Sequence, residues 1–159
     1  LGGAAAFISN VFDGLSIPFQ LVSKVGGDFR YPTVASQPPI VVPSAKTTFF
    51  HACFRKTSPD DHPERILRRV TACEPITPGD LPVGSWFDFG MAVGVGGEVL
   101  PETLERMFDI CGVVFADVQA MIRGFEEKTG TVLHLPLKHS GFYHLLPRIG
   151  GIKASLEEA

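Results

Sequence analysis

The chain has 159 residues, of which 45% are hydrophobic and 19% charged, and its formal net charge is −3. This length and composition are typical of one folded domain with a sizeable core, and they exclude an intrinsically disordered protein. The small negative charge does not favour nucleic acid or an anionic membrane as a partner. No apolar run approaches the roughly 20 residues that span a bilayer.

The three cysteines, Cys53, Cys73 and Cys111, are widely spaced and lie in or beside apolar runs. They are expected to be buried free thiols in a reducing compartment, which favours a cytoplasmic protein. The five histidines show none of the spacings that are typical of a zinc site.

The first segment places its apolar residues three to four positions apart, which is the spacing of a helix. This spacing predicts a helix over residues 4–12, with Gly14 suited to its C-terminal cap. The stretch "FQLVSKV" (19–25) then reads as a strand, which the turn Gly26-Gly27-Asp28 closes.

The next segment is rich in β-formers and prolines. Prolines dominate residues 31–43 and favour an extended loop or an edge strand. The strand-like "TTFFHACF" (47–54) is expected to pair with "ERILRRVTAC" (64–73). Residues 31–73 are therefore predicted to form a small β lid within the domain.

The second half alternates apolar strands with helices, which predicts an α/β fold with a mainly parallel sheet. A helix is expected from Pro101 to Cys111, with Leu104 on its apolar face. Residues 93–95 and 113–116 are expected to be parallel strands that are buried on both faces. A hairpin around "KTGTVLHLPL", an amphipathic stretch and a final strand at 152–154 follow.

The turn "GVGG" (94–97), between a strand and a helix, suggests a dinucleotide site. Asp117, 23 residues after Gly94, would then be the ribose-binding acid. However, the third glycine of G-x-G-x-x-G falls on Val99. A turn kept small for the close approach of a loop or ligand is the favoured interpretation, and the dinucleotide site is a lesser alternative.

Two further motifs each allow two interpretations. Gly2 and Gly3 precede an alanine-rich helix, either to let the backbone approach a ligand or simply to pack that helix. Ser155 and Glu158 spell the capping box S-x-x-E, which normally starts a helix. A serine and a glutamate at the end of a parallel strand can also orient a triphosphate and a water bound to magnesium.

Together, "GGAAAFISNVFDGLSIPFQLVSKVGGDF" and "LPRIGGIKASLEEA" resemble signatures of the ribokinase-like (pfkB-type) carbohydrate kinases. With "FDFGMAVGVGGEVLPETLERM" and "DVQAMIR", they look closest to the plant branch that phosphorylates inositol, over almost the entire chain. The resemblance implies a three-layer α/β domain with a mainly parallel sheet and a β lid. It also implies a kinase that uses ATP and Mg²⁺ and transfers the terminal phosphoryl to a hydroxyl of a polyol, here myo-inositol.

The resemblance also implies roles for single residues. Gly2 and Gly3 match a pair beside the acceptor and at the lid hinge, and Glu98 matches an acceptor-binding acid. Ser155 replaces an asparagine near the ATP phosphates, Glu158 matches the glutamate that helps to place Mg²⁺, and Asp28 is either structural or at the edge of the acceptor site. Phe7 stands where ribose kinases carry an acceptor-binding asparagine, which argues for a different polyol.

The family's general base is the aspartate of a G-A-G-D segment, and no G-A-G-D occurs in these 159 residues. The base is therefore expected beyond Ala159, and residues 1–159 are predicted to be an incomplete kinase domain without turnover of its own. A homodimer through the β lid is a further expectation. The alternative from another class is a non-catalytic remnant that binds a polyol or a protein partner.

Overall fold

The computed structural model describes residues 3–33, 38–56 and 64–155. Its helices are α1 (Ala4–Gly14), α2 (Pro101–Ile110) and α3 (Gln119–Ile122), and its 3-10 helices are η1 (Pro78–Asp80), η2 (Leu137–His139) and η3 (Tyr143–Arg148). The strands are β1 (Lys24–Gly26), β2 (Ile40–Val42), β3 (Phe49–Arg55), β4 (Glu64–Thr71), β5 (Phe87–Ala92), β6 (Cys111–Asp117), β7 (Arg123–Phe125), β8 (Val132–His134) and β9 (Gly151–Lys153).

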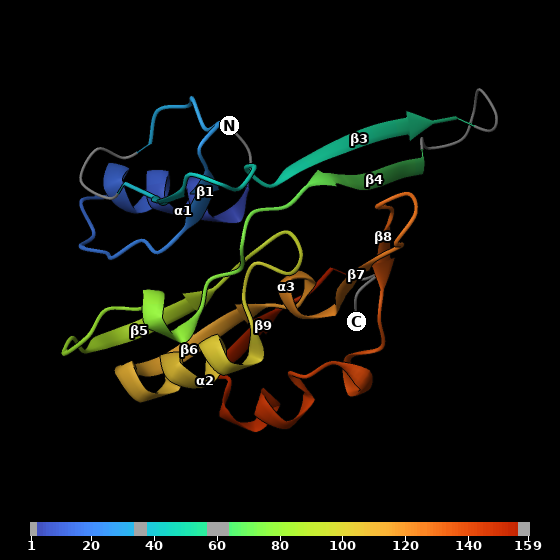
Figure 1. Ribbon diagram of the computed structural model, residues 1–159. Coiled ribbons are helices and arrows are strands. Elements are labelled where there is room, and N and C mark those ends of the chain that lie inside the picture. The colour runs from blue at the N-terminus through green and yellow to red at the C-terminus, as the bar shows by residue number, and fades with distance from the viewer. Residues whose placement is uncertain (1–2, 34–37, 57–63, 156–159) are drawn as a thin grey trace.

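The central unit is a parallel sheet with the strand order β5-β6-β9, which α2 covers on one face (Figure 1). Pro101 occupies the first turn of α2, where its missing N–H leaves no hydrogen bond unmade. Leu104 of α2 is fully buried, and it belongs to the same core as Val114 of β6 and Leu145 of η3. The predicted α/β class with a parallel sheet is therefore confirmed.

The opposite face of this sheet is apolar and exposed. Phe89 and Met91 of β5 and Val113 and Phe115 of β6 are each between 38% and 66% exposed. The prediction that these strands are buried on both faces is therefore wrong for the described residues, because α2 and η3 pack on one face only. The strand predicted at 93–95 is also wrong, since β5 ends at Ala92 and a loop follows.

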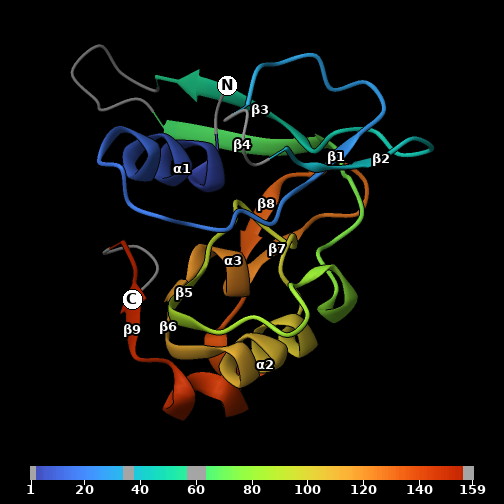
Figure 2. The same ribbon diagram turned by 90° about the vertical axis from the view of Figure 1, so that its left-hand side faces the viewer.

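Helix α1 lies on the side of the parallel sheet away from α2 (Figures 1 and 2). Its apolar side chains Phe7 and Val11 are exposed, and Ser9 is the residue of the helix that is buried. Gly14 is the last helical residue and does not form the expected left-handed cap. Instead, Ser16 has the positive φ, 54°, at which the chain leaves the helix.

The region from 31 to 73 contains two small β units. Strand β2 pairs in parallel with β1, which covers only the end of the strand predicted at 19–25. Strands β3 and β4 pair antiparallel, as expected, and this β3–β4 ribbon projects away from the parallel sheet (Figure 1). The assignment of this region as a lid stays a prediction.

The expected hairpin is also present, as β7 and β8. Among the described residues, no helix is long and apolar enough to cross a membrane. The three cysteines are free, but only Cys111 is buried, whereas Cys53 and Cys73 are partly exposed on and beside the ribbon. Burial raises the pKa of the Cys73 and Cys111 thiols, so these two thiols are protonated at neutral pH.

Candidate functional site

The candidate site lies at the carboxyl edge of the parallel sheet. Strand β5 continues there into the glycine-rich loop (residues 93–99), β6 ends at Asp117, and β9 ends two residues before Ser155. Since parallel strands end at the same edge, three segments that are distant in sequence meet there. This edge is where open α/β sheets bind their ligands.

The glycine-rich loop is closed on the side chain of Glu98. The Oε2 atom of Glu98 accepts hydrogen bonds from the amides of Val95, at 3.0 Å, and Gly96, at 2.6 Å. A Cβ atom on Gly94 would lie 2.7 Å from the same oxygen, so a side chain at position 94 would displace the carboxylate from these amides. The carboxylate thus holds loop amides in the way that a bound phosphate would.

This arrangement bears on two sequence-based interpretations. The loop amides that a pyrophosphate would need already bind Glu98, and α2 begins only after Leu100, without a side-chain cap. Both observations disfavour the dinucleotide site. One carboxylate oxygen of Glu98 binds the loop amides. The predicted contact of Glu98 with the phosphoryl acceptor would therefore have to use its other oxygen.

Asp117 is the charged group that is buried at this edge, with 7% of the residue exposed. Its Oδ2 atom lies 3.2 Å from Nζ of Lys153, its register partner on β9, and accepts a 2.9 Å hydrogen bond from Nε2 of Gln119. The Lys153 side chain is 67% exposed, so its charge is available at the surface. Sequence reasoning considered Asp117 only as a ribose acid. The position of Asp117 at the end of an apolar strand was the signal that it lies at the carboxyl edge, where it pairs with Lys153.

Arg123 at the start of β7 joins the hairpin to the same edge. Its Nη1 atom donates a 2.8 Å hydrogen bond to the carbonyl of Val95 in the glycine-rich loop. The loop is therefore held from two directions, by Glu98 from within and by Arg123 from a later strand.

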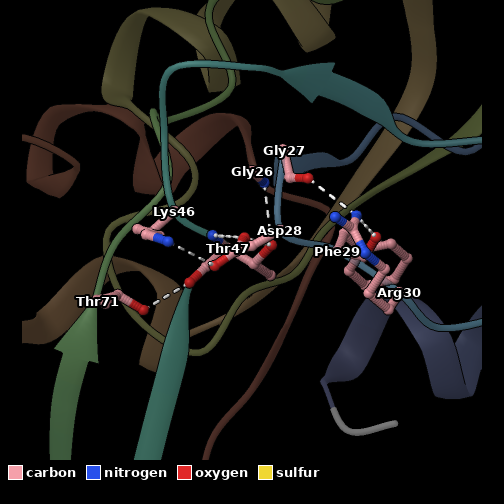
Figure 3. A network of polar contacts seen from close by, with 8 residues as sticks. All are labelled: Gly26, Gly27, Asp28, Phe29, Arg30, Lys46, Thr47 and Thr71. Atoms are coloured by element: carbon pink, nitrogen blue, oxygen red, sulfur yellow. Dashed lines mark hydrogen bonds and ion pairs between the residues drawn. The ribbon is translucent and has the colours of Figure 1, made fainter.

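Asp28 belongs to a separate polar network that Figure 3 shows. Its Oδ1 atom accepts hydrogen bonds from the amide and the hydroxyl of Thr47, each 2.8 Å long, and the Thr47 hydroxyl accepts one from the amide of Gly26. The two bonds from Thr47 hold the pKa of Asp28 below its ordinary value. The network ties the turn after β1 to the segment before β3, which supports the structural role of Asp28.

The other predicted site residues are distributed as follows. Glu98 and Ser155 come to the carboxyl edge of the parallel sheet, where Ser155 is exposed. Gly3 is the N-cap of α1, outside that sheet, with φ 109° and open space where a side chain would stand. Gly2 and Glu158 lie outside the described residues, and so does most of the predicted capping box.

The described residues form no ready-made cage of protein ligands for a metal ion. Within residues 3–33, 38–56 and 64–155, no group of three or more His, Cys, Asp or Glu side chains gathers around one point. Mg²⁺ usually takes one or two carboxylates and completes its shell with water and phosphate oxygens. Both oxygens of Asp117 already accept hydrogen bonds, from Lys153 and Gln119, so this carboxylate is a partner of Lys153 and not an open metal ligand.

Comparison with known proteins places this geometry in context. Over its whole length the chain is 58% identical to inositol 3-kinase of Arabidopsis thaliana, 50% to inositol 3-kinase of Zea mays and 50% to that of Oryza sativa subsp. japonica. It covers 44%, 45% and 42% of these proteins, so it spans less than half the length of the curated relatives that it matches. No protein-family model matches the chain.

One solved structure shares the fold. A pyrophosphate-dependent kinase in the ribokinase family, complexed with a pyrophosphate analog and myo-inositol, superposes on 96% of this chain and 52% of its own, with a TM-score of 0.67 and 16% identity. The resemblance that the sequence motifs carry is therefore confirmed. The homologues are named inositol 3-kinase, and the fold is that of a ribokinase-family kinase.

Proposed function

We propose that a protein containing this chain is a polyol kinase that transfers the terminal phosphoryl of ATP to a hydroxyl of myo-inositol. The observation that carries the proposal is the 58% identity to an inositol 3-kinase along the entire chain. The fold supports it, because the carboxyl edge that would bind the substrates is assembled from segments present here.

Phosphoryl transfer depends mainly on positioning and on charge neutralisation. The glycine-rich loop, fixed by Glu98 and Arg123, would form a rigid wall on the acceptor side. Lys153 would meet a phosphate oxygen of the donor, since its ammonium group is exposed, and Asp117 holds that ammonium group in place. Gly2 and Gly3 would let the backbone approach the acceptor, and Ser155 would contact the phosphates directly or through water.

Mg²⁺, when bound, would neutralise charge on the transferring phosphoryl group. Glu158 is the residue proposed to help to hold it. The general base is proposed to come from a segment outside these residues, because they contain no G-A-G-D. The carboxylates of this chain would therefore place the donor and the metal without removing the hydroxyl proton.

The phosphoryl donor needs its own test, since the similar structure is of a pyrophosphate-dependent enzyme. The protein encoded by the whole reading frame should be assayed with ATP or pyrophosphate, against myo-inositol, ribose, fructose and glycerol. We expect phosphorylation of myo-inositol with ATP and Mg²⁺. Turnover with pyrophosphate alone would reassign the donor, and the absence of any turnover would favour a non-catalytic remnant that binds a polyol or a protein partner.

Two further expectations belong to this proposal. A homodimer through the β3–β4 ribbon is supported by exposed apolar side chains on it, including Phe49 and Phe54. A cytoplasmic location is supported by the three free cysteines. Sedimentation of the full-length protein and imaging of a fluorescent fusion test these two expectations.

A further inference from the structure

The β7–β8 hairpin docks on the β3–β4 ribbon, and both views show β8 beside β4 (Figures 1 and 2). The amide of Arg69 in β4 donates a 2.8 Å hydrogen bond to the carbonyl of Gly130 in the hairpin turn, and Arg68 forms an antiparallel bridge with Thr131. Gly130 has φ 67°, and a Cβ atom there would lie 2.3 Å from the carbonyl oxygen of Arg69. The turn is thus shaped to fit this strand.

Phe125, at the end of β7, lies against both the ribbon and the glycine-rich loop. The guanidinium carbon of Arg69 lies 3.5 Å from the centroid of the Phe125 ring, and the ring of Phe50 in β3 lies 6.1 Å away. A Cβ atom on Gly96 would lie 2.8 Å from the same ring. One aromatic ring therefore contacts both strands of the ribbon and the loop that Glu98 closes.

The same short strand also holds the loop through the side chain of Arg123. The Nη1 atom of Arg123, two residues before Phe125, donates to the carbonyl of Val95, and a Cβ atom on Gly96 would lie 3.2 Å from the Cβ of Arg123. A displacement of the ribbon that moves Phe125 must therefore move the loop or break these contacts, because packed groups at van der Waals distance do not slide independently.

We propose that the β7–β8 hairpin is a latch that fixes the β3–β4 ribbon relative to the glycine-rich loop, with Phe125 as the positioning residue that couples them. The consequence for acceptor binding rests on the proposed function, because the loop forms the acceptor wall only if the protein is a polyol kinase. The mechanical coupling itself does not depend on it.

Amide hydrogen exchange on the full-length protein tests the coupling without any assay of activity. Removal of the ring in Phe125→Ala abolishes the cation–π and aromatic contacts, so exchange in 64–71 and in 93–99 should rise roughly tenfold. The matched control is Phe54→Ala, which removes a ring that is 68% exposed on the ribbon and should leave 93–99 unchanged. If Phe125→Ala does not fold, Phe125→Leu keeps an apolar group while losing the ring face, and both segments should still accelerate together.

Unchanged exchange in 93–99, whether or not 64–71 accelerates, would overturn the latch. In an active protein, Phe125→Ala should also raise the KM for myo-inositol several-fold while changing the KM for ATP by less than about twofold. An equal rise in both KM values would contradict the coupling to the acceptor side. If the wild-type protein phosphorylates no acceptor, the exchange result alone decides the latch, and the proposed function fails separately.

Discussion

The Nζ atom of Lys24 lies 2.6 Å from Oδ2 of Asp80, and the two side chains are only 8% and 17% exposed. Lys24 also donates to the carbonyl of Pro75, and Asp80 accepts hydrogen bonds from the amide and the hydroxyl of Thr77. This ion pair joins β1 to the turn that leads into the parallel sheet. It therefore links the N-terminal β unit to the unit that carries the candidate site.

Substitution of Lys24 should be strongly destabilising. Lys24→Met leaves the Asp80 carboxylate mostly buried without its cation, and we expect the free energy of unfolding to fall by about 3 kcal/mol. Urea denaturation of the full-length protein measures it. The control is Lys46→Met, because the Lys46 side chain is 70% exposed and 3.8 Å from Asp28, and exposed pairs contribute little. An equal fall in the free energy of unfolding in the two variants would contradict the claim that the buried pair is the more stabilising one.

The same pair predicts a dependence of stability on pH. Although burial alone would raise it, the pKa of Asp80 lies below its ordinary value of 3.8, because hydrogen bonds from Lys24 and Thr77 stabilise the carboxylate. The contribution of Asp80 to stability is complete above this ordinary pKa and is lost as the pH falls through the lower folded-state pKa. The stability difference between wild type and Asp80→Asn should therefore be constant above about pH 5 and shrink below about pH 4. A difference that shrinks as the pH rises would refute this assignment.

Two glycines differ in the space around them: Gly26 packs closely against other backbone atoms, whereas Gly14 faces open space. A Cβ atom on Gly26 would lie 2.4 Å from backbone atoms of Lys46 and Thr47, which cannot yield cheaply. Gly26→Ala should destabilise the full-length protein by about 2 to 4 kcal/mol. Gly14→Ala is the matched control, since it adds its methyl group to open space in α1 and should be neutral or stabilising by up to about 1 kcal/mol. Thermal denaturation of both variants decides between these outcomes.

Glu98 can be tested as a loop-fixing residue. Glu98→Ala removes the acceptor of two amides, which should lower the free energy of unfolding by about 2 kcal/mol and accelerate amide exchange at Val95 and Gly96. Glu98→Gln keeps one oxygen acceptor and should restore much of that protection. A different result would be weaker binding of the polyol in Glu98→Ala while both amides still exchange slowly. That result would indicate that Glu98 only contacts the polyol and does not fix the loop.

The polypeptide of these 159 residues, produced alone, should expose the apolar face around Phe89 and Phe115. We expect it to bind a hydrophobic dye, to aggregate and to show no kinase turnover. The double variant Phe89→Ser/Phe115→Ser should reduce aggregation of this polypeptide. The same double variant should destabilise the full-length protein if other segments cover the face there. Turnover by the isolated polypeptide would refute the assignment of the base to a segment outside it.

Local patterns in the sequence were sufficient for much of the fold. The Pro101 start and the spacing of Leu104 and Met107 predicted α2 to within a residue. The pairing of β3 with β4 and the β7–β8 hairpin were also predicted, because alternation and turn residues act within short stretches. The alternation of apolar strands with helices in the second half predicted the parallel sheet, and the family resemblance implied the same sheet.

Long-range relationships were not predictable in the same way. A hydrophobic run does not reveal which face a neighbour covers, so the exposure of Phe89 and Phe115 was missed. The family resemblance implied that Glu98 binds the phosphoryl acceptor, whereas only the folded loop shows that its carboxylate accepts hydrogen bonds from the amides of Val95 and Gly96. The pairing of Asp117 with Lys153 depends on two strands 36 residues apart being neighbours in one sheet.

The closure of the glycine-rich loop on Glu98 has a consequence for induced fit. Because the carboxylate satisfies the amides of Val95 and Gly96 before any substrate arrives, the loop loses its conformational entropy during folding and not during binding. This preorganisation would therefore lower the entropic cost of binding a ligand at the carboxyl edge of the sheet.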